Sequence, residues 1–181
     1  DNGIKVEVVF GFLKDNYDEK IISFANGVRT GDGGYHVTGF KKARTTCYNQ
    51  YGITNGLIKS SAPLDGDCLR EGLVAVLSVW VPEHRLQFEG QTKQKLGNSE
   101  ARGAVDSVVS EQLTYYLEQN PAVAKIICEK SIMAQRARDA ARKARDLTRR
   151  KTALGDTALP GKLADCSDKD PKNCEIYIVE G

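Results

Sequence analysis

The stretch that most constrains the fold is residues 73–81, which are almost entirely apolar and rich in β-branched side chains. Such a run is typical of a β-strand, and it is much shorter than the ~18 apolar residues that a membrane-spanning helix needs. Its apolar residues do not alternate with polar ones, so we predict that this strand is buried on both faces. It should therefore lie in the middle of a sheet that helices cover.

Two more strands are predicted near the start of the chain and one near its end. In residues 4–10, apolar and charged side chains alternate with the period of two that is typical of a half-buried strand. Residues 21–25 suit a strand, although a short helix would also fit. The chain becomes rich in Gly, Pro and Asp after Leu154, and residues 175–179 are expected to form a last strand.

The spacing of apolar residues predicts two helices that flank the central strand in the sequence. The first begins near His36 and carries an apolar face. That face consists of Val37, Phe40, Ala43 or Arg44, Cys47 and Tyr51. Residues 52–69 are rich in turn-forming residues and are expected to be a surface loop. The second helix runs from Asn98 or Ser99 to Asn120. Its stripe consists of Ala101, Ala104, Val105, Val108, Val109, Tyr116 and Leu117.

A third, long helix is predicted from Pro121 to about Lys151, with Asn120 as its cap and the proline in its first turn. Its stripe of recurring residues contains many alanines, which bury little area but allow close approach, so we expect a stiff rod along a neighbouring surface. The stripe consists of Ile126, Lys130, Met133, Ala137, Ala140, Ala144 and Leu147. These elements together predict an α/β (α+β) fold: a mixed sheet with helices packed on it and a long C-terminal helix.

Composition narrows the class of protein. A chain of 181 residues is long enough for one domain with a real core. The net charge of +2 excludes a polycation, so any affinity for nucleic acid must come from local clustering. The five cysteines are scattered without C-x-x-C spacing and only two histidines are present, which argues against a zinc site. We expect free thiols and a reducing, cytoplasmic environment.

The two ends of the sequence suggest a piece of a longer polypeptide. The chain opens without Met on Asp1 and stops on Gly181, directly after the apolar residues 175–179. A strand at that position needs partners in a sheet, so we expect further sequence beyond it.

Residues 87–100 are the first candidate for a functional site. Gly90 and Gly97 bracket a polar run that carries Lys93 and Lys95, so we expect a mobile backbone. A lysine in such a loop can reach toward a phosphate as a point charge. The alternative is a solvated lysine loop. The two histidines, His36 and His84, are expected to make turn hydrogen bonds.

The second candidate is the basic stretch of residues 136–151. It contains eight basic and two acidic residues, a balance of +6, and no aromatic residue for base stacking. One interpretation is a helix that pairs with DNA phosphates. The other is a solvated rod whose arginine stems cover neighbouring apolar surface.

Six blocks of the sequence resemble one family in the same order. They are residues 33–36, 70–73, 88–93, 136–145, 159–166 and 178–181. Together they resemble the transducer domain of DNA gyrase B, a component of a type IIA DNA topoisomerase, followed by the first strand of a TOPRIM domain. The resemblance implies a transducer domain at residues 1–153, with a ribosomal-protein-like fold, and a linker with the start of TOPRIM at residues 154–181. Small departures occur at Tyr35, where the family has Thr, and at Gly27 and Val28.

The resemblance also implies roles for individual residues. Gln91 and Lys93 would contact the γ-phosphate of ATP bound in a preceding domain. Glu180 would be the TOPRIM acid that serves catalysis and holds Mg²⁺ together with acids farther downstream. DNA contacts would come from Arg136, Arg142, Arg149 and Lys162.

The implied function is that of an ATP-dependent DNA topoisomerase that couples ATP hydrolysis to opening of a DNA gate. Its partners would be double-stranded DNA and gyrase A, in a cytoplasmic heterotetramer of two gyrase A and two gyrase B proteins, with no membrane. The chain alone is expected to have neither ATPase nor cleavage activity. Two alternatives stay open. One is the equivalent component of topoisomerase IV, although the run at residues 147–151 favours gyrase. The other is a free-standing basic nucleic-acid-binding module.

Overall fold

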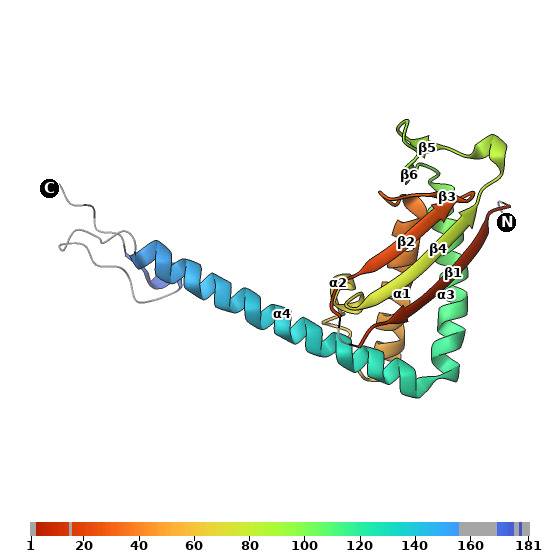
Figure 1. Ribbon diagram of the computed structural model, residues 1–181. Helices are drawn as coiled ribbons and strands as arrows, with labels where there is room; N and C mark the ends of the chain where they lie inside the picture. Colours follow the sequence, from red (N-terminus) through yellow and green to blue (C-terminus); the bar gives the residue numbers. More distant parts are fainter. Residues whose placement is uncertain (1–2, 15, 156–169, 176–177, 179–181) are drawn as a thin grey trace. The chain divides into compact units, whose positions relative to one another are not determined.

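The central sheet joins strands that lie far apart in the sequence (Figure 1). The structure is a computed structural model that describes residues 3–14, 16–155, 170–175 and 178, with the backbone alone for residues 149–155 and 171. It consists of two compact units, residues 1–138 and residues 139–181. The sheet and its covering helices belong to the first unit.

Four strands form the main sheet, in the order β1-β4-β2-β3. They are β1 (Lys5–Phe12), β2 (Lys20–Ala25), β3 (Val28–Arg29) and β4 (Leu73–Trp80). Strand β4 pairs antiparallel with β1 and parallel with β2, and β2 pairs antiparallel with β3, so the sheet is mixed. The predicted central position of residues 73–81 is confirmed, and residues 21–25 form a strand and not a helix.

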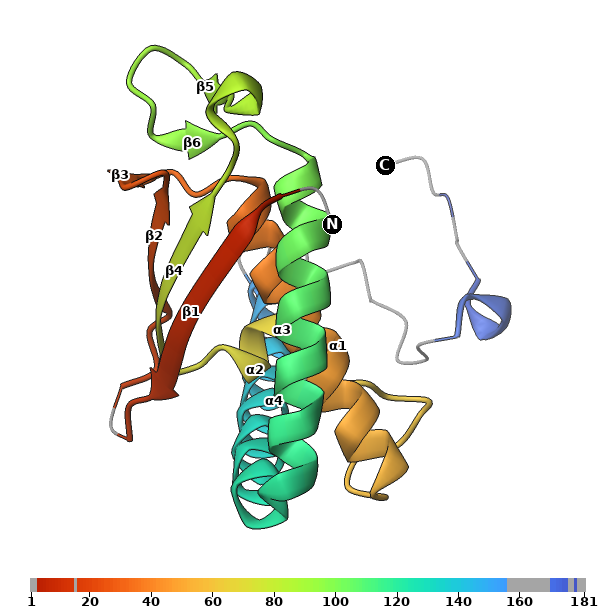
Figure 2. The same cartoon turned by 90° about the vertical axis from the view of Figure 1, so that its right-hand side faces the viewer.

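Two long helices, α1 (Tyr35–Thr54) and α3 (Glu100–Gln119), pack on one face of this sheet (Figure 2). A short helix, α2 (Gly66–Leu69), precedes β4, and the 3-10 helix η1 (Glu83–Arg85) follows it. The predicted mixed sheet with helices packed on it is confirmed. Helix α1 continues through Gly52, so the loop predicted from residue 52 begins later and contains α2.

The interior between the sheet and the two helices forms one apolar cluster. Its buried members are Ala25, Phe40, Ala43, Leu73, Ala75, Leu77, Val79, Leu96, Ala101, Val105 and Val109. Gly39 of α1 allows the two helices to approach closely, because a Cβ at this position would lie 2.5 Å from the carbonyl oxygen of Arg102 in α3. The stripe predicted for α3 is partly wrong, since Val108 and Tyr116 are exposed and Leu113 is buried instead.

The prediction that residues 73–81 are buried on both faces is wrong in this chain. Alternate residues of β4 are buried, whereas Val76 and Trp80 are 42% and 46% exposed on the other face. Val76 is paired with Val9 of β1 on one side and with Ile22 of β2 on the other. The described helices cover only the opposite face, so the apolar composition of the strand does not reflect burial on both sides.

Only Asn120, the C-cap residue of α3, separates α3 from helix α4 (Pro121–Gly155). The Asn120 carbonyl accepts the Ala124 N–H, while its side-chain amide donates to the carbonyl of Tyr116, so this side chain closes α3 and does not cap α4. Ala124 and Cys128 are buried in a second apolar cluster. That cluster also contains Cys47, Tyr48, Ile58, Leu64, Leu69, Leu113 and Leu117.

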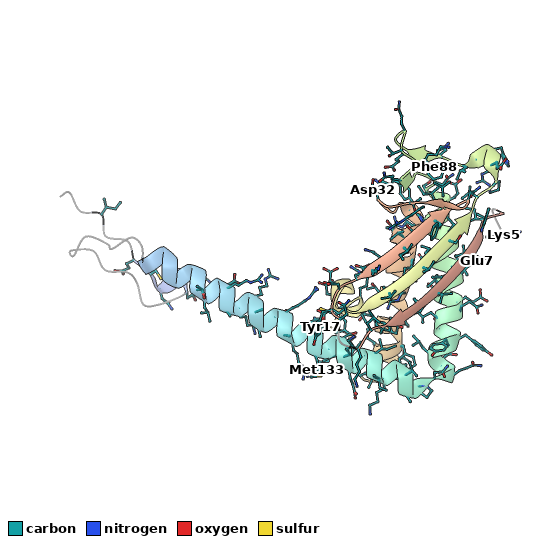
Figure 3. The ribbon with its side chains drawn as sticks, in the orientation of Figure 1. Lys5, Glu7, Tyr17, Asp32, Phe88 and Met133 are labelled. Carbon is teal, nitrogen blue, oxygen red and sulfur yellow. The ribbon has the colours of Figure 1, made fainter. Side chains whose placement is uncertain are left out.

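The stripe predicted for the long helix is also wrong. Ile126 and Met133 are 65% and 70% exposed, and Leu147 is exposed as well, whereas Ala124, Cys128 and Ser131 are buried (Figure 3 labels Met133). The fully buried residues of this face are small, and Ile127 and Ile132 also pack against the second cluster. Residues 139–148, the described side chains of α4 in the second unit, are all exposed. None of the described helices is both long and apolar enough to cross a membrane.

Arg44 is a buried cation in the middle of α1. Its exposed fraction is zero, and its Nη2 donates a long hydrogen bond of 3.4 Å to the carbonyl of Leu69. Its guanidinium carbon lies 5.1–5.6 Å from the ring centroids of Phe10, Phe12, Phe40 and Tyr48. Among the described residues its Nε and Nη1 have no hydrogen-bond partner. Burial lowers the pKa of this guanidinium, and the aromatic faces supply the attraction that a carboxylate usually gives.

Candidate functional site

The loop predicted at residues 87–100 is a short β-hairpin. Strand β5 (Phe88–Glu89) pairs antiparallel with β6 (Lys95–Leu96), and residues 90–94 form the turn between them. Gln91 and Lys93 are both exposed in this turn, and Lys93 has a left-handed backbone conformation with φ 55°. The hairpin therefore holds the two predicted phosphate-contacting residues together at its tip.

The hairpin is fastened to the segment just before α1 by backbone hydrogen bonds. The N–H of Asp32 donates to the carbonyl of Gln94 at 2.9 Å, and the N–H of Leu96 donates to the carbonyl of Gly33 at 3.0 Å (Figure 3 labels Asp32 and Phe88). Gly34, with φ 136°, lies so close to β6 that a Cβ would be 2.5 Å from the Leu96 carbonyl oxygen. The base of the hairpin is thus held in place by hydrogen bonds, and the mobility expected of its turn stays a prediction.

Asn98 fastens the other side of the hairpin. This side chain is 2% exposed; its Oδ1 accepts the N–H of Gln87 at 2.7 Å, and its Nδ2 donates to the carbonyl of Arg85 at 2.7 Å. The sequence identified Asn98 only as a possible start of the following helix. An Asn close to the start of a helix is a capping signal, but Ser99 is the N-cap residue of α3, and the Asn98 side chain pairs with backbone groups eleven and thirteen residues earlier.

The two lysines of the hairpin are in different environments. Lys95 pairs with Glu89 across the hairpin at 2.7 Å, and the hydrogen bond and charge of Glu89 raise the pKa of Lys95. No ion pair involves Lys93 anywhere in the described part of the chain. A positive charge without an internal partner is the one that an external anion can neutralise, so Lys93 is the better candidate of the two.

A shallow cavity of about 360 Å³ lies at the base of the hairpin. It is lined by Asp32, Gly33, Gly34, Tyr35, Val37, Thr38, Lys41, Glu89 and Lys95. Charges of both signs line it, so it does not favour an anion on electrostatic grounds. The tip residues Gln91 and Lys93 are not part of this lining.

His36 makes a structural hydrogen bond inside the first unit. It is fully buried, and its Nε2 lies 3.1 Å from the hydroxyl of Thr30 at the end of β3. Burial lowers the pKa of His36 from 6.5 to about 4, so its imidazole is neutral in the folded protein near pH 7. His36 is in the first turn of α1, so this contact is a buried side-chain hydrogen bond and not the turn hydrogen bond that was expected.

This burial predicts acid sensitivity. Between pH 6.5 and about 4, the unfolded chain binds a proton at His36 that the folded chain does not, so the free energy of unfolding should fall by about 3 kcal/mol across this range. Below pH 4 both states are protonated and this contribution ends. Urea unfolding of the 181-residue chain at several pH values measures it. The variant His36→Gln should lose this slope and His84→Gln should keep it; an unchanged slope in His36→Gln would refute the assignment.

The residues predicted to contact DNA are only partly described. Arg136 and Arg142 are exposed on α4. The side chain of Arg149, all of Lys162 and all of Glu180 lie outside the described residues, as does most of the strand predicted at 175–179. One arginine of the basic stretch, Arg138, is already engaged, because it pairs with Glu71 at 3.3 Å and with Asp67 at 3.6 Å. The described residues contain no group of three or more His, Cys, Asp or Glu that could hold a metal ion.

A family model for DNA gyrase B matches residues 1–147 of the chain. The chain belongs to the DNA gyrase B family. Similar curated proteins include the DNA gyrase B of Clostridium acetobutylicum, which is 52% identical over 182 residues. The DNA gyrase B of Eisenibacter elegans is also 52% identical over 182 residues. Both alignments cover 100% of this chain but only 28% and 37% of the respective relatives, so the chain spans about a third of the length of these gyrase B proteins.

Solved structures of the gyrase B family and of topoisomerase IV share the fold. The 43K ATPase domain of Thermus thermophilus gyrase B, in complex with an aminocoumarin, matches with a TM-score of 0.71 and 47% identity over 80% of this chain and 38% of that chain. The topoisomerase IV ATP-binding domain of Francisella tularensis matches with a TM-score of 0.66 and 29% identity over 75% and 36% of the two chains. The mixed α/β fold of this gyrase B family member thus agrees with its structural relatives, and its sequence is more similar to the gyrase relative.

Proposed function

We propose that residues 1–153 are the transducer domain of a gyrase B protein and that residues 154–181 are a linker with the start of a TOPRIM domain. In the full-length protein this domain would couple ATP binding and hydrolysis in another domain to opening of the DNA gate. The proposal draws on the family membership and on the motif blocks quoted above. Alone, the chain should have neither ATPase nor DNA cleavage activity.

The observation that carries the proposal is the position of Lys93 at the tip of a hairpin with a fixed base. Its ammonium group has no ion-pair partner among the described residues, whereas Lys95 in the same hairpin is neutralised by Glu89. Hydrogen bonds from Asp32, Leu96 and Asn98 hold the base of the hairpin to the segment just before α1 and to the segment after β4. Movement of the tip would therefore be transmitted to the body of the domain.

Gln91 and Lys93 suit the terminal phosphate of ATP. An ammonium group can neutralise charge on the γ-phosphoryl oxygens, and the neutral amide of Gln91 can donate a further hydrogen bond to them. The described residues offer no cradle for the nucleotide, so ATP and Mg²⁺ would be held by other domains. Mg²⁺ at a TOPRIM site would require Glu180 together with acids beyond this chain.

The wider assembly follows from the same proposal. The long helix α4 would carry the displacement toward the DNA gate, and Arg136, Arg142, Arg149 and Lys162 would lie on the DNA side. The partners would be double-stranded DNA and gyrase A, in a cytoplasmic heterotetramer of two gyrase A and two gyrase B proteins. Topoisomerase IV is disfavoured by the higher identity to the gyrase relatives.

Protection of Lys93 from an amine-acylating reagent tests the phosphate contact. In the full-length protein, a non-hydrolysable ATP analogue at about ten times its Kd should slow acylation of Lys93 by about tenfold. ADP, which lacks the γ-phosphate, should protect it much less. Lys95 of the same hairpin is the internal control and should react equally under all conditions. Equal protection of Lys93 by ADP and the analogue would contradict the proposed contact.

The alternative of a free-standing DNA-binding module makes a different prediction. Because Arg138 pairs within the chain, the basic helix has fewer cations for phosphates than its sequence suggests. We therefore expect the chain to bind duplex DNA weakly, with binding abolished as salt is raised to physiological levels. Tight binding at physiological salt, with a salt dependence that corresponds to about six or more phosphates, would favour the alternative.

A further inference from the structure

Helix α4 is attached to the segment before β4 by ion pairs and polar contacts. Arg138 Nε lies 3.3 Å from Glu71 Oε1, and Arg138 Nη1 lies 3.6 Å from Asp67 Oδ2. One helical turn earlier, Gln135 Oε1 accepts the N–H of Asp65 at 3.0 Å. Arg138 is the last residue of the first unit, so these contacts are made where α4 passes from the first unit to the second.

A second α4 residue, Lys130, ties the helix to the ends of two strands. Its Nζ donates to the carbonyl of Leu13, after β1, at 3.4 Å and to the carbonyl of Glu71, before β4, at 3.3 Å. The ammonium group also lies 5.6 Å from the ring centroid of Phe12. The first part of α4 is thus held to the end of the sheet at several points.

The ion pairs of Arg138 continue toward α1. Asp67 also pairs with Arg70, and Arg70 Nε pairs with Glu19 Oε2 at 3.2 Å. Glu19 Oε1 in turn pairs with Lys41 of α1 at 2.8 Å. The side chains of Arg70 and Glu71 are only 15% and 16% exposed, whereas those of Arg138 and Asp67 are 47% and 59% exposed. Lys41 lines the cavity at the base of the Lys93 hairpin, together with Glu89 and Lys95.

We propose that these side chains act as one ion-pair network that sets how α4 is held against the sheet and how much of a hairpin displacement reaches α4. The network consists of Lys41, Glu19, Arg70, Asp67, Arg138 and Glu71. One end adjoins the cavity at the base of the hairpin, and the other end is on α4. The proposal rests on the coupling function proposed above and assigns to these residues a positioning role.

The physical basis is the alternation of charge along the network. Single exposed ion pairs contribute little, but a network in which each charge has two partners holds its side chains in place more firmly. Glu19 and Asp67 each bridge two cations, and Arg70 and Arg138 each bridge two carboxylates. Loss of one bridging charge therefore weakens the attachment of its neighbours as well.

A double-mutant cycle in the full-length protein, assembled with gyrase A, tests the network. The variants are Glu19→Gln, Arg138→Gln and the double variant, and the readout is the number of superhelical turns introduced per ATP hydrolysed. Each single variant should lower this ratio by about threefold or more, which is typical of changes along a coupling network. The double variant should show no larger loss than the greater of the two single variants, because both changes interrupt the same network.

Glu111→Gln and Arg102→Gln are matched controls, since both residues are exposed on α3 and have no ion pair within the described part of the chain. They should keep the parental ratio. Amide hydrogen exchange at residues 65–72 gives a readout that does not depend on catalysis. Exchange at these residues should be faster in both single variants than in the parental protein. In the double variant it should be no faster than in the single variants. Should Arg138→Gln prevent folding, Glu19→Gln, which leaves α4 unchanged, carries the same comparison.

Three outcomes would overturn the network proposal. They are a parental ratio of superhelical turns to ATP in both single variants, additive losses in the double variant, and equal losses in the controls. The proposed coupling function would be refuted by a different result, namely parental ATP turnover in the Lys93→Ala variant. The two failures are therefore distinguishable in one set of assays.

Discussion

Replacing Lys93 by Ala in the full-length protein is expected to lower ATP turnover by about a hundredfold or more, which is the usual cost of removing one charged or hydrogen-bonding group from a developing oxyanion. The reason is that the Lys93 ammonium group lies at an exposed hairpin tip, without an ion-pair partner among the described residues, and would neutralise the γ-phosphoryl oxygens. Steady-state ATP hydrolysis and supercoiling by the assembled enzyme measure the effect, and both should fall together.

Lys95→Ala is the matched control for this change. It removes the same kind of side chain from the same hairpin, but Lys95 is paired with Glu89 and is assigned no ligand. ATP turnover should stay near the parental rate in this variant. Gln91→Ala should have a smaller effect than Lys93→Ala, because a neutral amide stabilises a phosphate less than a charge does. Parental turnover in Lys93→Ala would end the phosphate-contact proposal.

Replacing Gly39 by Ala is expected to destabilise the chain by about 3 kcal/mol, at the upper end of the usual cost of overpacking. The added Cβ would lie 2.5 Å from the carbonyl oxygen of Arg102 and 3.1 Å from its Cα, and both are backbone atoms that cannot rotate away. Helices α1 and α3 would have to separate, which loosens the apolar cluster between them. Urea unfolding of the 181-residue chain measures the change.

Gly103→Ala is the control on the facing helix. Gly103 lies in α3, and a Cβ there would meet nothing within 4 Å. The change should raise the free energy of unfolding by about 0.5–1 kcal/mol, because alanine favours a helix more than glycine does. Equal stability of the two variants would show that the close approach at Gly39 does not limit the packing of α1 on α3.

The elements with clear periodicity could be predicted from the sequence. The alternation in residues 4–10 and the apolar run at 73–81 indicated the two long strands, and the spacing in residues 121–151 indicated the long helix. The prediction of which faces of β4 are buried was wrong. Apolar residues such as Val76 and Trp80 raise the strand propensity of β4, but only the packing of distant helices decides whether they are buried.

The same limit explains the error on α4. The predicted stripe combined alanines with large residues such as Ile126 and Met133, yet the buried residues of the described helix are Ala124, Cys128 and Ser131. Ala124 and Cys128 belong to the second cluster, and Ile127 and Ile132 pack against it, so this face contains small and large residues. Three- and four-residue spacing alone did not identify the buried face, because apolar residues occur on several faces of this helix.

The candidate site was only half predictable. The motif placed Gln91 and Lys93, and their roles remain predictions. The base of the hairpin depends on pairing between Gly34 and Leu96, which are far apart in the sequence. Pairing between residues so far apart in the sequence leaves no local sequence pattern, so the fixed base of the hairpin could be found only from the structure.

The buried Arg44 has a consequence for how this protein can vary. Its guanidinium group has no carboxylate partner among the described residues and is stabilised by the four surrounding rings, which come from β1 and α1. Substitutions of the arginine and of its surrounding rings must therefore occur together. An aliphatic residue in place of a ring would leave the buried guanidinium charge without that stabilising contact. A homologue with an uncharged residue at this position is free to fill the same space with aliphatic side chains.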